Sequence, residues 1–182
     1  ELAYLDTHYY GGIKKYQWVT IPLALHGGVA KTDGSVVDIN IGEEEDDPVF
    51  CITDLLIHLS GEQMEKTAAK VVEGDALNLL IGSIPLKEEE KDAVKKNVLK
   101  LLKDKYDIEE EDFLSAELEI VPAGKARECG LDRSMILAYG QDDRVCAYTS
   151  LEAILDMKKV KRTACCILVD KEEIGSVGAT GM

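Results

Sequence analysis

Histidine is scarce in this sequence, and several common catalytic motifs do not occur. Its three histidines, His8, His26 and His58, have no helical or strand spacing to a cysteine or to one another that would indicate a zinc site. No glycine-rich phosphate loop follows a strand-like run, and neither a G-x-S-x-G elbow nor a Walker motif occurs. The sequence therefore gives no sign of a P-loop nucleotide site or of a serine-hydrolase elbow.

Long apolar runs and positive charge are also lacking. The longest uninterrupted apolar run, residues 164–169, is far shorter than the roughly 20 residues that a membrane-spanning helix needs. No basic start followed by an apolar core marks a signal peptide. The 21 Lys and Arg against 35 Asp and Glu give a formal net charge of −14, and such a surface repels phosphate backbones. We expect neither nucleic acid nor a membrane as a partner.

The cysteines show no pairing pattern. They number five, none belongs to a C-x-x-C pair, and most stand in apolar contexts. Reduced core thiols in a cytoplasmic protein are favoured over disulfides, and a cysteine-based zinc finger is set aside. The residues are Cys51, Cys129, Cys146, Cys165 and Cys166.

The first two thirds of the chain predict an α+β domain with mainly antiparallel strands. Two runs rich in aromatic and β-branched residues flank Asp33-Gly34, which is typical of a hairpin turn. Val94, Val98, Leu101 and Leu102 line one face of the clearest predicted helix. The predicted strands are 16–31, 36–41, 48–52 and 77–86, and the predicted helices are 54–59, 62–72 and 87–106.

The remaining chain changes to a strand, helix, strand order. Residues 116–121 alternate as a half-buried strand does, 142–158 have helical spacing, and 163–169 form an apolar run typical of a strand covered on both faces. This order predicts a layered α/β sheet, so the fold class is α/β. We place a domain boundary near residue 115.

Two adjacent carboxylates, Glu172 and Glu173, follow the last apolar run and precede Gly175. Ligand sites in open α/β sheets gather at the carboxyl ends of strands. One glutamate is able to bind a cation there while its neighbour takes a proton from metal-bound water. A solvated loop is the simpler interpretation of the pair alone.

Two further residues have two interpretations each. Asp142 lies just before a predicted helix, where it is able either to bridge two metal ions or to cap the helix. His58 stands among Leu56, Ile57 and Leu59, and such surroundings favour a packing histidine.

Five segments in combination resemble one known family. They are Thr7 to Gly12, Ile57 to Leu59, Ala123 to Ala126, Gly140 to Cys146 and Asp170 to Ser176, of which the last two together are the most specific. Over essentially all 182 residues the sequence is similar to the metallo-aminopeptidases that include aspartyl aminopeptidase and yeast vacuolar aminopeptidase I. Bacterial members are the most similar, and the chain resembles an internal piece of one.

The resemblance implies an architecture. Family members carry two zinc ions in a three-layer α/β catalytic domain, which is interrupted by an inserted domain that builds dimers and dodecameric shells. Residues 1–115 are then expected to be the inserted dimerisation domain, and residues 116–182 part of the catalytic domain. A homo-oligomer is the implied assembly.

The resemblance also implies roles for four residues. Asp142 corresponds to the aspartate that bridges both zinc ions, Glu173 to a ligand of one zinc, and Glu172 to the general base. His58 corresponds to a histidine of the inserted domain that reaches into a neighbouring subunit's active site and steadies the oxyanion, in place of the packing role. Relatives often have Leu-Asp-Asn where this chain has Gln141-Asp142-Asp143, and the role of Asp143 is not indicated.

The expected function is therefore zinc-dependent hydrolysis of the N-terminal residue from peptides by metal-activated water. The family site also needs a histidine upstream and an aspartate and a histidine downstream, so the chain alone is expected to be inactive and not to retain zinc. The alternative is a non-catalytic oligomerisation module that contributes His58 to the neighbouring site. An acidic α/β protein without a metal is the third interpretation, and the preferred N-terminal residue of the substrate cannot be identified.

Overall fold

The computed structural model describes residues 1–171, and the chain divides into two compact units. Unit 1 comprises residues 1–9 and 13–124, and unit 2 comprises residues 10–12 and the chain from Lys125 onward. Among the described residues, no helix combines the length and the apolar character needed to cross a bilayer.

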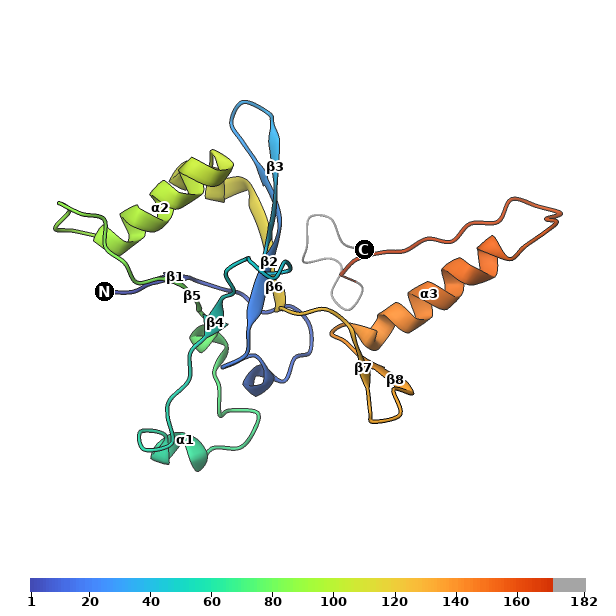
Figure 1. Ribbon diagram of the computed structural model, residues 1–182, viewed down its shortest axis with the longest axis horizontal. Helices are drawn as coiled ribbons and strands as arrows, with labels where there is room; N and C mark the ends of the chain where they lie inside the picture. Colours follow the sequence, from blue (N-terminus) through green and yellow to red (C-terminus); the bar gives the residue numbers. More distant parts are fainter. Residues whose placement is uncertain (172–182) are drawn as a thin grey trace. The chain divides into compact units, whose positions relative to one another are not determined.

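The elements of the two units are drawn in Figure 1. Unit 1 contains the strands β1 (Ala3–Leu5), β2 (Leu23–Ala30), β3 (Val36–Ile41), β4 (Cys51–Ile52), β5 (Leu79–Gly82) and β6 (Ala116–Pro122), and the helices α1 (Gly61–Met64) and α2 (Ala93–Tyr106). Short 3-10 helices lie at Lys15–Gln17, Gly74–Ala76 and Glu110–Ser115. Unit 2 contains β7 (Arg127–Cys129), β8 (Met135–Leu137) and α3 (Gln141–Leu155).

The central sheet of unit 1 has the order β3-β2-β6, and both pairings are antiparallel. The predicted hairpin is confirmed, because β2 and β3 pair from Leu25–Ile41 to Ala30–Val36. Its turn is closed by the Lys31 carbonyl and the Asp33 carboxylate, which accept hydrogen bonds from neighbouring groups of the turn. Aspartate and glycine in this tight turn act through local chemistry, which is why the sequence predicts it well.

A second antiparallel sheet has the order β1-β5-β4, and α2 packs against β5 and β1. The core lies between the elements of these two sheets: Leu23 and Leu79 are fully buried, and Ile108 after α2 closes the cluster. Burying aliphatic side chains of this size stabilises the folded unit by about 1.5–3 kcal/mol each relative to leaving them in water. The other buried members of the cluster are Leu25, Val29, Ile39, Ile41, Ile52, Val72 and Leu77.

Several predicted elements are shorter than expected or absent. The helix over 87–106 begins only at Ala93, because Asp92 has φ 53° and so cannot continue the helix backwards. Residues 54–59 form turns, and the helix predicted over 62–72 is limited to Gly61–Met64. Within residues 62–72 only Val72 is buried, so a helix over this whole range would have no buried face. A helix of this length without packing is only marginally stable in water, which is why the helix does not extend past Met64.

The strand predicted over 163–169 is not formed within the described residues. Ile167, Leu168 and Val169 are exposed, because no strand of residues 1–171 pairs with this segment. The predicted strand over 116–121 is confirmed as β6, and it pairs with β2 in unit 1. The functional boundary near residue 115 stays a prediction, since the division into compact units after Gly124 is a statement about contacts.

Gly27 is the point of closest approach between β2 and β6. Its φ is +139°, and a Cβ built on it would lie 2.0 Å from the backbone oxygen of Glu117. No side chain fits there without moving the strand, whereas a Cβ on Gly28 would meet nothing closer than 3.8 Å. Glycine at position 27 therefore permits the β2–β6 pairing.

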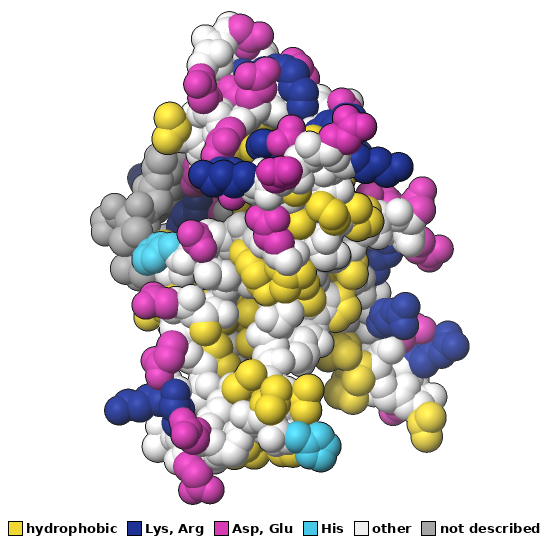
Figure 2. Space-filling model, turned by 90° about the vertical axis from the view of Figure 1, so that its left-hand side faces the viewer, with side chains coloured by type: hydrophobic (Ala, Val, Ile, Leu, Met, Phe, Trp, Pro, Cys, Tyr) yellow, Lys and Arg dark blue, Asp and Glu magenta, His cyan; other side chains and the backbone are white. Residues whose placement is uncertain are grey.

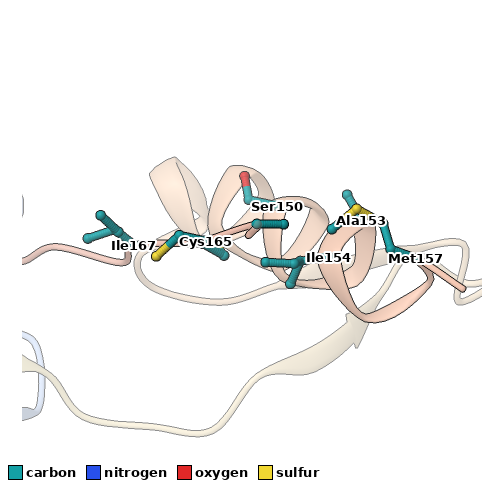
Figure 3. Close-up of a pocket in the computed structure, with 8 residues that line it drawn as sticks. Ser150, Ala153, Ile154, Met157, Cys165 and Ile167 are labelled. Carbon is teal, nitrogen blue, oxygen red and sulfur yellow. The ribbon is translucent and has the colours of Figure 1, made fainter. Parts of the chain in front are cut away.

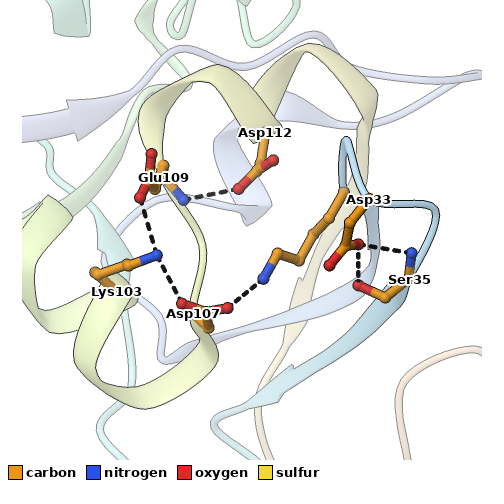
Figure 4. Close-up of polar contacts among 7 residues, drawn as sticks. Asp33, Ser35, Lys103, Asp107, Glu109 and Asp112 are labelled. Atoms are coloured by element: carbon orange, nitrogen blue, oxygen red, sulfur yellow. Dashed lines mark hydrogen bonds and ion pairs between the residues drawn. The ribbon is translucent and has the colours of Figure 1, made fainter.

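A charged network joins the end of α2 to the hairpin (Figure 4). Asp107, the residue that ends α2, has φ 55° and carries a negative charge where the helix dipole is already negative. Lys103 offsets this charge at 2.6 Å, and Lys31 from the hairpin contacts the other carboxylate oxygen. The hydrogen bonds from Lys103 and Lys31 lower the pKa of Asp107 from 3.8 to about 2.

Replacing Gly27 by alanine is expected to destabilise the protein by at least about 2 kcal/mol, because both the space and the backbone conformation exclude a Cβ. Gly28→Ala is the matched control and should leave the free energy of unfolding within about 0.5 kcal/mol. Urea denaturation of both variants measures the difference. Equal stability of the two variants would contradict the assigned close approach at Gly27.

The Asp107 network predicts a specific loss of stability in acid. A carboxyl with a lowered folded pKa contributes stability above its ordinary pKa, and the contribution is lost as the pH falls from about 4 towards about 2. The stability difference between the native protein and Asp107→Asn should therefore be largest near neutral pH and shrink in that window. Urea midpoints measured between about pH 6 and about pH 2.5 test this. Asp104→Asn, which removes only a pair with Lys100, is the control.

Candidate functional site

His58 lies in an exposed loop of unit 1 between β4 and α1. The interpretation of His58 as a packing histidine is wrong for this chain, because its side chain is exposed. Its aliphatic neighbours are exposed too, with Ile57 at 67% and Leu59 at 68%. In Figure 2 apolar side chains lie at several places on the face drawn, among them its lower part, where charged side chains stand beside them. The loop presents an imidazole and an apolar surface to its surroundings.

Polar contacts hold both ends of this loop. The Gln63 amide nitrogen Nε2 lies 2.7 Å from Asp54 Oδ1 and 3.2 Å from the Val71 carbonyl oxygen. At the other end, Ser60 is buried, and its hydroxyl donates to the carbonyl of Ile57. The sequence analysis missed Gln63 and Asp54, because nine residues separate them and no motif joins them.

Asp142 lies in the first turn of α3 in unit 2. Gly140 is the N-cap of this helix, and no side chain caps it. The interpretation of Asp142 as a helix cap is therefore wrong. Asp142 is exposed with non-helical φ −92° and ψ 110°, and within residues 1–171 its carboxylate makes no hydrogen bond. It is accessible to a ligand, and oxygen from aspartate is a donor that zinc accepts.

Glu172 and Glu173 lie outside the described residues. The described chain ends at Lys171, whose carbonyl accepts a hydrogen bond from the Tyr10 hydroxyl. Tyr10 belongs to one of the five segments that carry the family resemblance, so this contact joins two of them within unit 2. The meeting of Glu172 and Glu173 with Asp142 stays a prediction.

The zinc donors of residues 1–171 do not form a complete site. No three His, Cys, Asp or Glu side chains in this part of the chain lie together as a metal site requires. His58 and Asp142 belong to different units. Asp142 and Glu173 are oxygen donors of the type that suits zinc, but the described residues supply only the first of them.

A groove in unit 2 lies between α3 and the extended segment that follows it (Figure 3). Its volume is about 380 Å³, and Ile154, Met157 and Ile167 give it apolar walls. Cys165 and Cys166 also line it, and all five cysteines of the chain are free thiols. The prediction of unpaired thiols is therefore confirmed. The prediction that the thiols lie in the core is wrong for Cys146 and Cys165, which are exposed. None of the residues that line the groove carries a charged side chain.

Comparison with known proteins gives a consistent result. The family model described as aminopeptidase I zinc metalloprotease (M18) matches residues 1–182. A probable M18 family aminopeptidase 1 of Clostridium acetobutylicum is 66% identical over all of this chain and 39% of its own length. A probable M18 family aminopeptidase 1 of a Borrelia garinii strain is 55% identical over all of this chain and 40% of its own length.

The solved structures agree. The crystal structure of an M18 family aminopeptidase from Thermotoga maritima has a TM-score of 0.91 and 53% identity, covering 99% of this chain and 39% of that one. Aminopeptidase I from Clostridium acetobutylicum has a TM-score of 0.89 and 64% identity, covering 100% of this chain and 40% of that one. The chain thus spans about 40% of the length of the relatives it matches. These likenesses, with the mixed helices and antiparallel sheets, confirm the predicted α/β class.

Proposed function

Because this chain belongs to the M18 family of aminopeptidase I zinc metalloproteases, we propose that the protein containing it is a zinc-dependent aminopeptidase that removes the N-terminal residue from peptides. The match of the family model to every residue of the chain carries the proposal. The five free thiols suit a reducing compartment, so we place the protein in the cytoplasm.

Three carboxylates have a role in the proposed site: Asp142, Glu172 and Glu173. Asp142 and Glu173 would be the residues of this chain that hold zinc. Zinc, when bound, lowers the pKa of a coordinated water to near neutrality and polarises a carbonyl group. Glu172 then acts as the general base that takes the proton of the attacking water. The exposed carboxylate of Asp142 is the described feature that supports this assignment.

His58 is assigned to the oxyanion that develops on the substrate carbonyl, in the active site of a neighbouring subunit. Its exposed position on an apolar loop supports an intermolecular role, because no group of its own unit covers it. A preorganised donor of this kind typically contributes about 100- to 1000-fold to turnover.

This chain alone is proposed to be inactive and not to retain zinc. It brings two carboxylate ligands and a base, whereas a pair of zinc ions about 3.5–4 Å apart needs several protein ligands and a bridging water. Three carboxylates at one place without cations would also repel one another.

A second candidate function is assembly. Leu55, Leu56, Ile57 and Leu59 are all more than half exposed, and a contiguous apolar surface of this kind commonly marks a protein–protein contact. We propose that unit 1 builds a homo-oligomer through this surface, dimeric first and then a dodecameric shell, which would also deliver His58 to the neighbouring site.

Substituting Glu172 by glutamine in the full-length protein is expected to lower kcat by at least about 100-fold while leaving most of the zinc bound. Hydrolysis of an aminoacyl nitroanilide gives kcat, and elemental analysis gives the zinc content. Glu152→Gln, an exposed substitution on α3, is the control. Equal loss of turnover and zinc would contradict the general-base role.

The assembly function is tested on the 182-residue chain itself. Light scattering is expected to show an oligomer, and assays with added zinc are expected to show no hydrolysis. Ile57→Asp should reduce the oligomer, whereas Ile84→Asp, equally exposed but outside the loop, should not. A monomer in light scattering, or the same effect from both substitutions, would argue against assembly through this loop.

A further inference from the structure

The loop that carries His58 has little packing to give it a fixed shape. Asp54 to Leu59 are exposed, and the aliphatic side chains among them face outward. A short exposed segment without buried apolar contacts is usually among the most mobile parts of a fold. Its conformation therefore depends on the polar contacts that tie it to the unit.

Gln63 supplies two of those contacts through one side-chain nitrogen. Its Nε2 lies 2.7 Å from Asp54 Oδ1 at the start of the loop and 3.2 Å from the carbonyl of Val71 behind it. An amide NH₂ has two hydrogens to donate, so both acceptors are served at once. Asp54 Oδ1 also accepts the N–H of Leu55 at 2.8 Å, which fixes the direction in which the loop departs.

The end of the loop is fixed by its own turn. The N–H of Leu59 donates to the Leu56 carbonyl at 2.9 Å, and the hydroxyl of buried Ser60 donates to the Ile57 carbonyl at 3.1 Å. The two hydrogen bonds of Gln63, to Asp54 and to the Val71 carbonyl, are called the clamp below. His58 lies within the turn, between Asp54, which the clamp holds, and Ser60. Removing the clamp would leave this turn attached to unit 1 at its Ser60 end alone, so the turn and His58 would be free to swing together.

We propose that Gln63 is a positioning residue for His58. The inference rests on the proposed function, in which His58 acts on the oxyanion in a neighbouring active site. A catalytic donor must be held closely, since a displacement of about 1 Å can cost about 100-fold in rate. A neutral amide suits this position, because a glutamate at position 63 would set its carboxylate against that of Asp54.

The test is a double-mutant cycle in the full-length enzyme, with kcat and KM measured on an aminoacyl nitroanilide. Gln63→Ala is expected to lower kcat by about 10-fold or more and to change KM by less than about threefold. In the His58→Ala background the same substitution is expected to change kcat by less than about twofold, because Gln63 acts through His58. Gln17→Ala, on an exposed 3-10 helix, is the control and should leave kcat unchanged.

A second variant guards against a general loss of folding. Gln63→Glu is expected to lower kcat, and adding Asp54→Asn is expected to restore part of the loss. The amide introduced at position 54 would then donate to the carboxylate introduced at position 63, so the contact with the start of the loop reforms with its polarity reversed, whereas the hydrogen bond to the Val71 carbonyl is not restored. Thermal unfolding and light scattering accompany each variant, to show that the fold and the assembly are retained.

The outcomes separate the two ideas. If His58→Ala leaves kcat unchanged, the proposed role of His58 fails. If His58→Ala lowers kcat but Gln63→Ala does not, or lowers it equally in both backgrounds, only the positioning inference is overturned. Because the same loop carries the proposed assembly surface, kcat is compared at protein concentrations at which light scattering shows the Gln63→Ala oligomer intact; if kcat is then unchanged, the positioning inference is overturned. If the Asp54→Asn exchange restored none of the lost kcat, the contact between positions 63 and 54 would not be the one that positions His58.

Discussion

Strand β2 is hydrogen-bonded along both edges, to β3 on one side and to β6 on the other. The pairing with β6 is the constraint on which unit 1 depends, because it joins residues that are far apart in the chain. It requires a backbone approach at Gly27 that no side chain permits. Once β2 is held in this way, Leu23 and Leu25 face the core that the second sheet completes. The exposed loop of His58 follows β4, whose Ile52 belongs to that core.

The elements that could be predicted are those whose causes are local. The hairpin follows from Asp33-Gly34, and the helical spacing of Val94 and Val98 gives α2, although the left-handed backbone at Asp92 shortens it. Alternation at residues 116–121 predicted a strand but not its partner, since pairing with β2 is a long-range choice. The apolar run at 163–169 was misleading, because hydrophobicity reports a tendency to be buried and says nothing about which segment provides the cover.

The candidate site shows the same division. Family resemblance selected Asp142 and His58, and the structure finds both exposed and rules out the simpler interpretation of each, helix capping for one and core packing for the other. Their meeting with Glu172 and Glu173 involves residues beyond the described part of the chain. Gln63 could not be found from the sequence, because a glutamine that donates to a distant carboxylate and a carbonyl leaves no pattern. Its importance arises from the loop's lack of packing, which is a property of the fold alone.

The groove beside α3 has a consequence for handling the protein. One of its walls is formed by residues 164–167, which belong to the apolar run 164–169; this run contains no charge, proline or glycine and includes the β-branched Ile167 and Val169. Six-residue segments of this composition are the usual template for amyloid-like stacking when their backbone has no partner. A solution of the isolated 182 residues would then accumulate amorphous precipitates or fibrils as its concentration rises. Dilution and thioflavin staining would separate such material from a specific, saturable assembly.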